Sequence, residues 1–138
     1  MAATLKLEIV TPEAKVYSED VEMVTLPAVE GEMGIFPNHV PLMTQVEPGE
    51  IVVRKDGHDH LLAVGEGFVK ITGEHVAIMT DMAIRADDID EAKAEEARQR
   101  AQARLAESID DEEAAMVSAA LAHSLAQLKV KRRRGSGG

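Results

Sequence analysis

The 138-residue sequence has no cysteine and no tryptophan, and it contains one tyrosine and two phenylalanines. Without cysteine there is no disulfide framework, no thiolate metal site and no thiol nucleophile. The scarcity of aromatic rings removes the stacking platforms that bind single-stranded nucleic acid. A formal charge of −10 also opposes binding to phosphates. No apolar run approaches the roughly 20 residues that span a bilayer. We therefore expect neither nucleic-acid binding nor direct insertion into the bilayer.

The N-terminal segment lacks both the apolar core of a signal peptide and an Arg/Ser-rich leader, so we expect a cytosolic chain without a targeting step. Breaker residues are missing from the second half. Every proline lies at or before Pro48, and residues 87–126 contain no glycine and many alanines. Such a composition is typical of helix, whereas the Gly/Pro-punctuated first half is typical of short strands. The predicted parts are residues 1–86, residues 87–134 and a flexible tail at 135–138.

The first half shows strand periodicity. Leu5, Leu7 and Ile9 alternate with polar residues, which predicts a half-buried strand. Asp56-Gly57 predicts a hairpin turn. Many short strands at close spacing favour a sandwich or barrel over a parallel α/β sheet. The other β-rich runs are residues 21–26, 51–53, 61–64, 68–71 and 76–79.

The second half predicts two antiparallel helices. Asp88 with Glu91, and Asp110 with Glu113, form potential capping boxes at the two starts. Because the helix contacts are mostly alanine, they bury little area, and we infer a hairpin that can detach. The predicted stripes are Ala94, Ala97, Ala101 and Leu105 in the first helix, and Val117, Leu121, Leu125 and Leu128, flanked by Met116 and Ala120, in the second.

Residues 26–48 hold four of the five prolines and predict an unusual loop. An acidic turn, Glu30 to Glu32, precedes an apolar tetrad from Met33 to Phe36, and Gly31 or Gly34 can take a positive φ. A loop that only connects strands is normally polar. Two interpretations stay open. The loop folds onto its own core, or it offers a fixed apolar surface to a partner.

Few residues suggest chemistry. His58 and His60 would share one face of a strand, but they lack an obvious third metal ligand, and a solvated hairpin is the default interpretation. There is no nucleophile elbow and no phosphate-binding loop. We expect no catalytic residue, no metal and no cofactor. The basic end is either solvated or bound to an acidic protein surface; it comprises Lys129, Lys131, Arg132, Arg133 and Arg134.

Three stretches resemble one family. Residues 26–49 are similar to its pattern EGELGI-P-H-PL-T-PG, residues 64–94 to its strand–strand–AIR–acidic–helix junction, and residues 118–130 to part of its second helix. With the N-terminal LEIVTPE, the similarity covers nearly the whole chain. The family is the epsilon subunit of the bacterial F-type ATP synthase, which is called delta in mitochondria.

The resemblance implies an α+β fold in which a ten-stranded β-sandwich precedes an antiparallel two-helix hairpin. It implies a non-catalytic central-stalk subunit, one copy per complex, peripheral at the cytoplasmic face of the bacterial inner membrane. Its partners would be the gamma subunit and the c-ring loops. The acidic turn would face the ring, and residues 37–42 would belong to the gamma-facing wall or to the core. The implied contact residues are Glu30, Gly31, Glu32, Met33, Gly34, Ile35, Phe36, His39 and Leu42.

In this family the hairpin is movable. Folded down it permits turnover, and extended it obstructs ATP hydrolysis while its basic end meets the alpha and beta catalytic subunits. Some members bind ATP through a motif that here reads Ile89 to Ala94, with Lys93 in place of an arginine beside Asp90. Arg100 is at a matching place, whereas the second helix has His123 and Gln127 instead of arginines. We expect weak or no ATP binding, with nucleotide sensing as the alternative function.

Overall fold

The computed structural model describes residues 3–136. Ten strands come first and two α-helices follow, so the predicted α+β architecture is confirmed. A 3₁₀ turn, η1 (Ala86–Asp88), leads from the sheet to α1 (Glu91–Leu105) and α2 (Asp111–Ser136). The strands are β1 (Leu5–Val10), β2 (Lys15–Val21), β3 (Met23–Ala28), β4 (Gly31–Ile35), β5 (His39–Val46), β6 (Gly49–Lys55), β7 (His58–Val64), β8 (Gly67–Gly73), β9 (His75–Thr80) and β10 (Ala83–Arg85).

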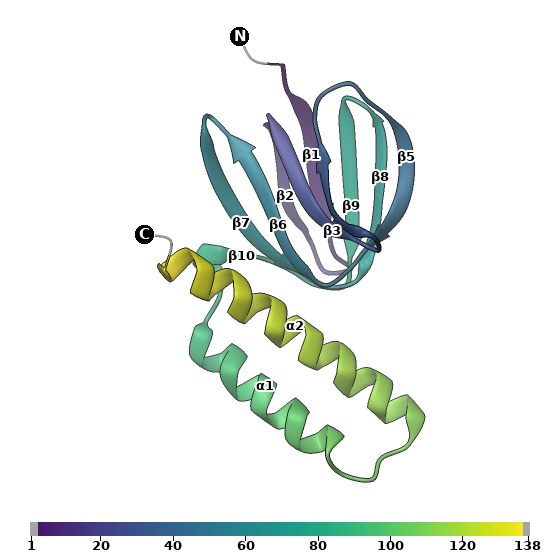
Figure 1. Cartoon of the computed structure of the whole chain (residues 1–138), viewed down its shortest axis with the longest axis vertical. Coiled ribbons are helices and arrows are strands. Elements are labelled where there is room, and N and C mark those ends of the chain that lie inside the picture. Colours follow the sequence, from purple (N-terminus) through teal and green to yellow (C-terminus); the bar gives the residue numbers. More distant parts are fainter. Residues whose placement is uncertain (1–2, 137–138) are drawn as a thin grey trace.

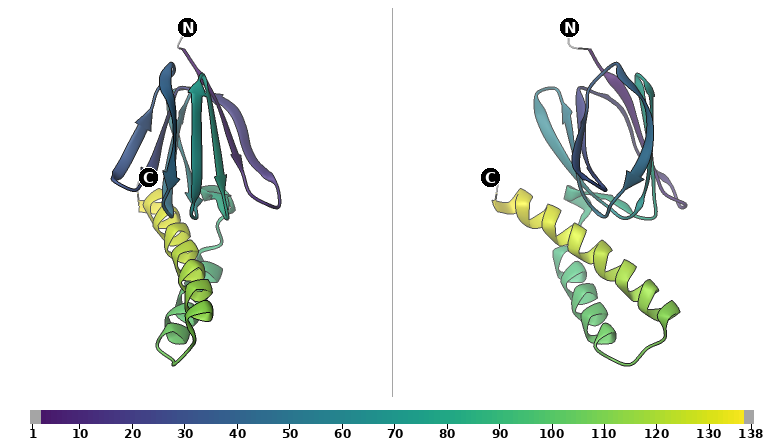
Figure 2. Two further views of the ribbon diagram at one scale, coloured as in Figure 1. Left: turned by 90° about the vertical axis from the view of Figure 1, so that its right-hand side faces the viewer. Right: turned by 45° about the vertical axis from the view of Figure 1, so that its right-hand side comes forward.

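The strands form one sheet in the order β10-β7-β6-β3-β5-β8-β9-β1-β2, with β4 paired to β3. β1 runs parallel to β9, and the other pairs of described strands are antiparallel. β3 and β5 share one residue pair, Ala28 with Val46. At this corner the sheet folds over, and Figures 1 and 2 show the two resulting layers facing each other. The result is a sandwich.

Apolar side chains from both layers fill the sandwich. In β1, Leu5, Leu7 and Ile9 are buried and the intervening residues are less so, which confirms the predicted alternation. Fully burying one such side chain stabilises the fold by about 1.5–3 kcal/mol. All residues of this core cluster lie between Leu5 and Ile78. The sandwich therefore has a core to which the helices contribute nothing.

The prediction of a loop over residues 26–48 is wrong, because most of these residues form β4, β5 and part of β3. The prolines lie where the sheet tolerates them. Pro41 falls between His39 and Leu42, where the register of β5 against β8 shifts. Periodicity also failed to predict β2, in which three of seven residues are charged. Asp56 and Gly57 both have positive φ, which confirms the predicted turn between β6 and β7.

Asp90 caps α1, so the prediction that Asp88 is the N-cap of the first helix is wrong. Asp90 Oδ1 accepts a hydrogen bond from the backbone N–H of Lys93 at 3.1 Å. Asp88 instead ends the 3₁₀ turn, which delays the start of the helix. In α2, the Oδ1 of Asp110 accepts from the backbone N–H of Glu113 at 2.8 Å, so this predicted cap is confirmed.

α2 lies between the sandwich and α1, as Figure 1 shows, and it packs against β6 and β7. The apolar stripe predicted for the second helix is wrong at Leu125. Leu125 is exposed, and Ser124 is the buried residue at this point of α2. The hydroxyl of Ser124 donates to the carbonyl oxygen of Ala120 at 3.0 Å, so this polar group is satisfied within the helix. Leu128 is buried as predicted.

α2 continues to Ser136, so the basic residues belong to its last turns instead of following it. Residues 137 and 138 of the predicted tail lie outside the described residues, and so does the side chain of Arg134. Across residues 3–136, no helix combines the length and the apolar character needed to cross a membrane.

Candidate interaction surfaces of the sandwich and the hairpin

The β3–β4 hairpin carries the first predicted contact residues. Its turn exposes Glu30 and Gly31, and the φ of Gly31 is +117°, a conformation that residues with side chains rarely adopt. Along β4 the side chains alternate: Glu32 faces solvent, Met33 is half-buried and Ile35 is fully buried in the core. Ile35 is therefore unavailable to a partner, which corrects the expected contact set.

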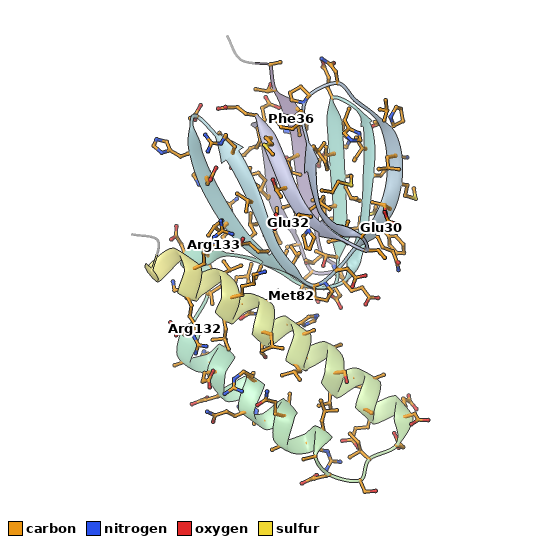
Figure 3. The ribbon with its side chains drawn as sticks, in the orientation of Figure 1. Glu30, Glu32, Phe36, Met82, Arg132 and Arg133 are labelled. Carbon is orange, nitrogen blue, oxygen red and sulfur yellow. The ribbon has the colours of Figure 1, made fainter. Side chains whose placement is uncertain are left out.

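Phe36 lies at the opposite end of β4 from Glu30. Figure 3 shows Phe36 at the end of the sandwich far from the helices, and Glu30 near the end that faces them. A strand advances roughly 3.3 Å per residue, so the two side chains belong to different ends of the domain. Phe36 is 57% exposed, and nearby in sequence Val40 is 71% exposed. The predicted contact residues thus span the length of the sandwich, not one loop tip.

Three more exposed apolar side chains share the outer face of β5, β8 and β9: Met43, Phe68 and Met79. Phe68 pairs directly with Met79 in β9 and with Gln45 in β5, and Met43 is two residues from Gln45 on the same face. Single exposed hydrophobic residues are ordinary, but adjacent ones on one face mark an interaction surface. We call Met43, Phe68 and Met79 the apolar face.

His39 and Leu42, the remaining predicted contacts, both belong to β5. The Nδ1 of His39 donates to the carbonyl oxygen of Val40 at 2.7 Å, which fixes the orientation of the ring. Leu42 is 40% exposed and lines a groove together with Glu32 and other residues of the β3–β4 hairpin. The groove makes the β3–β4 hairpin and β5 one continuous surface.

The helices dock on the sandwich through a second, smaller cluster. Its buried members are Ala63, Ala86, Ile89, Ala126 and Val130. Leu61, Met82 and Ile84 are partly buried around it, and Figure 3 shows Met82 between the sandwich and α2. Three of the five buried members are alanines, which bury little apolar area. This docking cluster is therefore much weaker than the sandwich core.

Gly65, between β7 and β8, allows α2 to approach closely. A Cβ atom at Gly65 would lie 2.0 Å from the Oδ1 of Asp81 and 2.7 Å from the Nε2 of His123 in α2. The same Nε2 lies 3.1 Å from Asp81 Oδ1, so a protonated His123 forms an ion pair across the interface. A larger residue at this glycine would push both side chains away.

The basic end of α2 binds other parts of the chain. The Nε of Arg132 donates to Glu91 Oε2 at 3.1 Å, and its Nη2 donates to Glu95 Oε2 at 3.3 Å. The Nζ of Lys131 donates to the carbonyl oxygen of Ala86 at 3.2 Å. These contacts join the last turns of α2 to the start of α1 and to η1.

Arg133 reaches in the other direction, toward the sandwich, where its Nη1 donates to Glu50 Oε1 at the start of β6. The side chain of Glu50 is only 6% exposed, and its Oε2 is buried without a hydrogen-bond partner. A buried carboxylate depends strongly on its cation. Lys129, in contrast, is exposed and makes no ion pair with any described residue.

Ion pairs within the hairpin keep its carboxylates charged. The hydrogen bond from Arg98 lowers the pKa of Glu95 to about 2, and Arg132 contributes to the shift. A hydrogen bond from Arg104 lowers the pKa of Glu113 and links α1 to α2. The carboxylate of Glu113 therefore binds Arg104 and does not accept from the backbone N–H of Asp110, which the predicted capping box required. The carboxylate that Arg132 contacts on Glu95 is fully ionised at neutral pH.

The residues considered for nucleotide binding are only partly brought together. Asp90 and Lys93 meet at the start of α1, where the carboxylate of Asp90 serves as a helix cap. Arg100 lines a separate groove between α1 and α2, to which neither of them contributes. The structure thus gives Asp90 a structural role and places Arg100 apart.

His58 and His60 share one face of β7, as expected from their spacing, and both are exposed. Within residues 3–136, no three His, Cys, Asp or Glu side chains gather closely enough to hold a metal ion. The pair thus lies on a solvated hairpin between β6 and β7.

Sequence reasoning missed the apolar face and Glu50. For Phe68 and Met79 a signal existed, because each occupies a position where strand alternation predicts a polar residue. For Glu50 no local signal existed, since its partner Arg133 is 83 residues away in sequence. Contacts of this kind depend on how the two domains dock.

Two family models match the chain. The β-sandwich domain of the ATP synthase delta/epsilon chain matches residues 4–86, and the long alpha-helix domain of the same chain matches residues 87–132. One curated relative is the ATP synthase epsilon chain of Laribacter hongkongensis. It is 37% identical over 129 residues, which cover 92% of each chain.

Solved structures agree. A chain of the Euglena gracilis mitochondrial ATP synthase (OSCP/F1/c-ring, rotational state 1) matches with a TM-score of 0.75 and 25% identity, over 94% of this chain and 81% of that one. A chain of the Tetrahymena thermophila mitochondrial ATP synthase (central stalk/c-ring) has a TM-score of 0.53 and 13% identity, over 63% and 70% of the two chains, and shows the fold alone. On the strength of both domain matches and the full-length relative, the chain belongs to the delta/epsilon family of ATP synthase, as a non-catalytic subunit.

Proposed function

We propose that the chain sits in the central stalk, where its sandwich binds the gamma subunit and the c-ring loops and couples them during proton-driven rotation. The observation that carries this proposal is the apolar face, Met43, Phe68 and Met79, which stays exposed although the core beneath it is complete. A close-packed sandwich suits this work because dense interiors resist deformation. The similarity to a chain from an ATP synthase assembly that contains a c-ring supports the ring as a partner.

Within this proposal, the two kinds of surface bind different partners. The acidic turn with Glu30 and Glu32 contacts the polar loops of the ring. The apolar face contacts gamma, and so do His39 and Leu42 of β5. One copy per complex then lies at the cytoplasmic face of the bacterial inner membrane as a peripheral subunit.

On the same proposal, the helical hairpin of α1 and α2 regulates ATP hydrolysis. Docked against the sandwich it permits turnover, and extended along the stalk it obstructs rotation while its basic end meets the alpha and beta subunits. Two observations support this role. The sandwich core contains no hairpin residue, and the docking cluster is mostly alanine. The hairpin can therefore leave without unfolding the sandwich.

The test is reconstitution of an ATP synthase depleted of this subunit. Phe68→Asp should weaken binding to gamma by at least about 2 kcal/mol, as expected for an interface hot spot, and leave the melting temperature unchanged. Met116→Asp likewise replaces an exposed apolar side chain with aspartate, but in the helical hairpin, and serves as the control. If the unaltered chain does not bind gamma, the coupling proposal is wrong.

Phe36→Asp and Glu32→Lys probe β4 in the same way, because both side chains are exposed. Each should weaken assembly while the sandwich stays folded. A large drop in melting temperature for Phe36→Asp would instead support inward packing of this residue.

Nucleotide sensing is the alternative function, and the position of Arg100 beside the groove between α1 and α2 favours it. Calorimetry of the purified chain with millimolar ATP decides the matter. Binding that is lost in Arg100→Gln would support it, and the absence of heat would remove it.

A further inference from the structure

A polar cavity opens at one side of the sandwich, where the two ends of the sheet come together. β2 and β10 end the strand order of the sheet, and residues of β2, β6, β7, β10 and η1 line the cavity, whose volume is about 250 Å³. Its buried lining residues are Tyr17, Leu62 and Ala86. None of its lining residues belongs to the apolar face, to the β3–β4 hairpin or to the groove between α1 and α2. We call it the edge cavity.

Charged and polar side chains of the edge cavity occupy positions where strand alternation predicts core residues. Glu19 pairs with Leu7 of β1, and Leu7 is fully buried. His60 pairs with Val53 of β6, which is fully buried as well. Directly paired residues share one face of a sheet, so Glu19 and His60 belong to the inner face. Lys55 does too, because it lies two residues after Val53 in the same strand.

Basic groups in the edge cavity retain N–H donors for a ligand. Two contacts fix the guanidinium of Arg85: its Nη2 donates to the carbonyl oxygen of Val16 at 3.2 Å, and its Cζ lies 4.9 Å from the centre of the Tyr17 ring. An arginine carries five N–H donors, so most of them remain available. The Nζ of Lys55 donates to the Oε1 of Glu19, and an ammonium group has two further donors.

Glu19 is a half-buried carboxylate surrounded by basic groups. The hydrogen bond from Lys55 lowers the pKa of Glu19, and the charges of neighbouring basic groups, including His60, add to the effect. The other lining carboxylates, Asp56 and Asp87, are exposed, so solvent and salt screen their charges. Asp87 also has an interaction partner within the chain. One half-buried carboxylate does not balance the basic groups around it, and the cavity therefore favours an anion.

We propose that the edge cavity binds inorganic phosphate through Arg85, Lys55 and His60. The planar fork of an arginine matches two phosphate oxygens, and a lysine adds a compact positive charge. Pockets for drug-sized ligands measure roughly 300–1,000 Å³, so a cavity of about 250 Å³ suits a small ion better than a nucleotide. This site is independent of the partners of the proposed function, and it lies apart from the groove that Arg100 lines.

Calorimetry of the full-length chain with inorganic phosphate at constant ionic strength tests the site, with sodium chloride as the control titrant. Phosphate should give saturable heat, and sodium chloride should give none. Arg85→Gln should weaken phosphate binding about tenfold or more, because charge-assisted hydrogen bonds are lost. Arg54→Gln is the matched control. Arg54 precedes Lys55 in β6 and forms an ion pair with Asp59 on the outer face, so its loss should change the affinity by less than about twofold.

Glu19→Gln predicts a change of the opposite sign. The substitution removes the carboxylate that repels an incoming anion and releases Lys55, so the affinity for phosphate should rise about threefold or more. His60→Gln should lower the affinity. Because both side chains are partly or fully exposed, these two variants decide the matter if circular dichroism shows that Arg85→Gln does not fold.

Inward-pointing charges also serve another purpose in sheet proteins, since they keep an open edge from pairing with a second chain. If that is their whole role here, water alone fills the cavity and phosphate gives no saturable heat, which would overturn the proposal. Equal affinities of Arg85→Gln and Arg54→Gln would overturn it as well. Glycerol phosphate should bind more weakly than inorganic phosphate, and the reverse order would assign the cavity to a phosphate ester instead.

Discussion

Replacing Val130 with alanine should loosen the docking of the hairpin and leave the sandwich intact. Val130 is fully buried in the docking cluster and is absent from the sandwich core. The substitution removes two methyl groups at about 0.8 kcal/mol each, a loss of about 1.6 kcal/mol. This loss shifts the docking equilibrium about 15-fold toward the undocked state, and an unfilled cavity would add to it.

Val24→Ala in β3 is the matched control, because Val24 is equally buried but belongs to the sandwich core. It should destabilise the sandwich by a similar free energy and leave docking unchanged. Two measurements separate the outcomes. Energy transfer between labels on the sandwich and the hairpin reports docking. Urea unfolding followed by the fluorescence of Tyr17, the one tyrosine of the chain and a member of the core, reports the sandwich.

The opposite pattern would refute the reasoning. If Val130→Ala lowers the unfolding free energy of the sandwich as much as Val24→Ala does, while the hairpin stays docked, the two clusters form one cooperative unit. A movable hairpin would then require partial unfolding of the sandwich.

Gly65→Ala should displace α2 from the sandwich, and adding His123→Ala should restore docking, as measured by energy transfer between labels on the two domains. If Gly65→Ala leaves α2 in place, the close approach of α2 to Gly65 is contradicted. Hydrogen bonds, first from Lys15, lower the pKa of Glu8 to about 2, so its stabilisation is present above pH about 4.5 and is lost toward pH 2. In urea unfolding, Glu8→Gln should therefore be less stable than the unaltered chain at pH 7, and the difference should narrow at pH 3. A chain without residues 87–138 should fold and bind gamma; an insoluble product would contradict this.

Local patterns in the sequence predicted much of the fold. A two-residue alternation identified β1, and the spacing of apolar runs identified β6 to β9, because a strand exposes and buries side chains in turn. Alanine without breakers identified the two helices, and Asp56-Gly57 identified a turn that requires two positive φ angles. The resemblance supplied the number of strands and the family.

Other strands escaped prediction because their residues are locally unfavourable. β5 contains Pro41, and β2 contains three charged residues, yet both are held by long antiparallel partners. Pairing across the sheet outweighs a weak intrinsic preference, since β propensity depends largely on neighbouring strands.

By itself, the sequence determined the division into strands and helices, the capping of α2 by Asp110 and the family of the chain, since each depends on residues near one another in sequence. The tertiary structure decided which residues can act. It buried Ile35 and exposed Phe36, and it brought Arg133 to Glu50. Burial and ion pairing depend on distant segments meeting, and no local pattern contains that information.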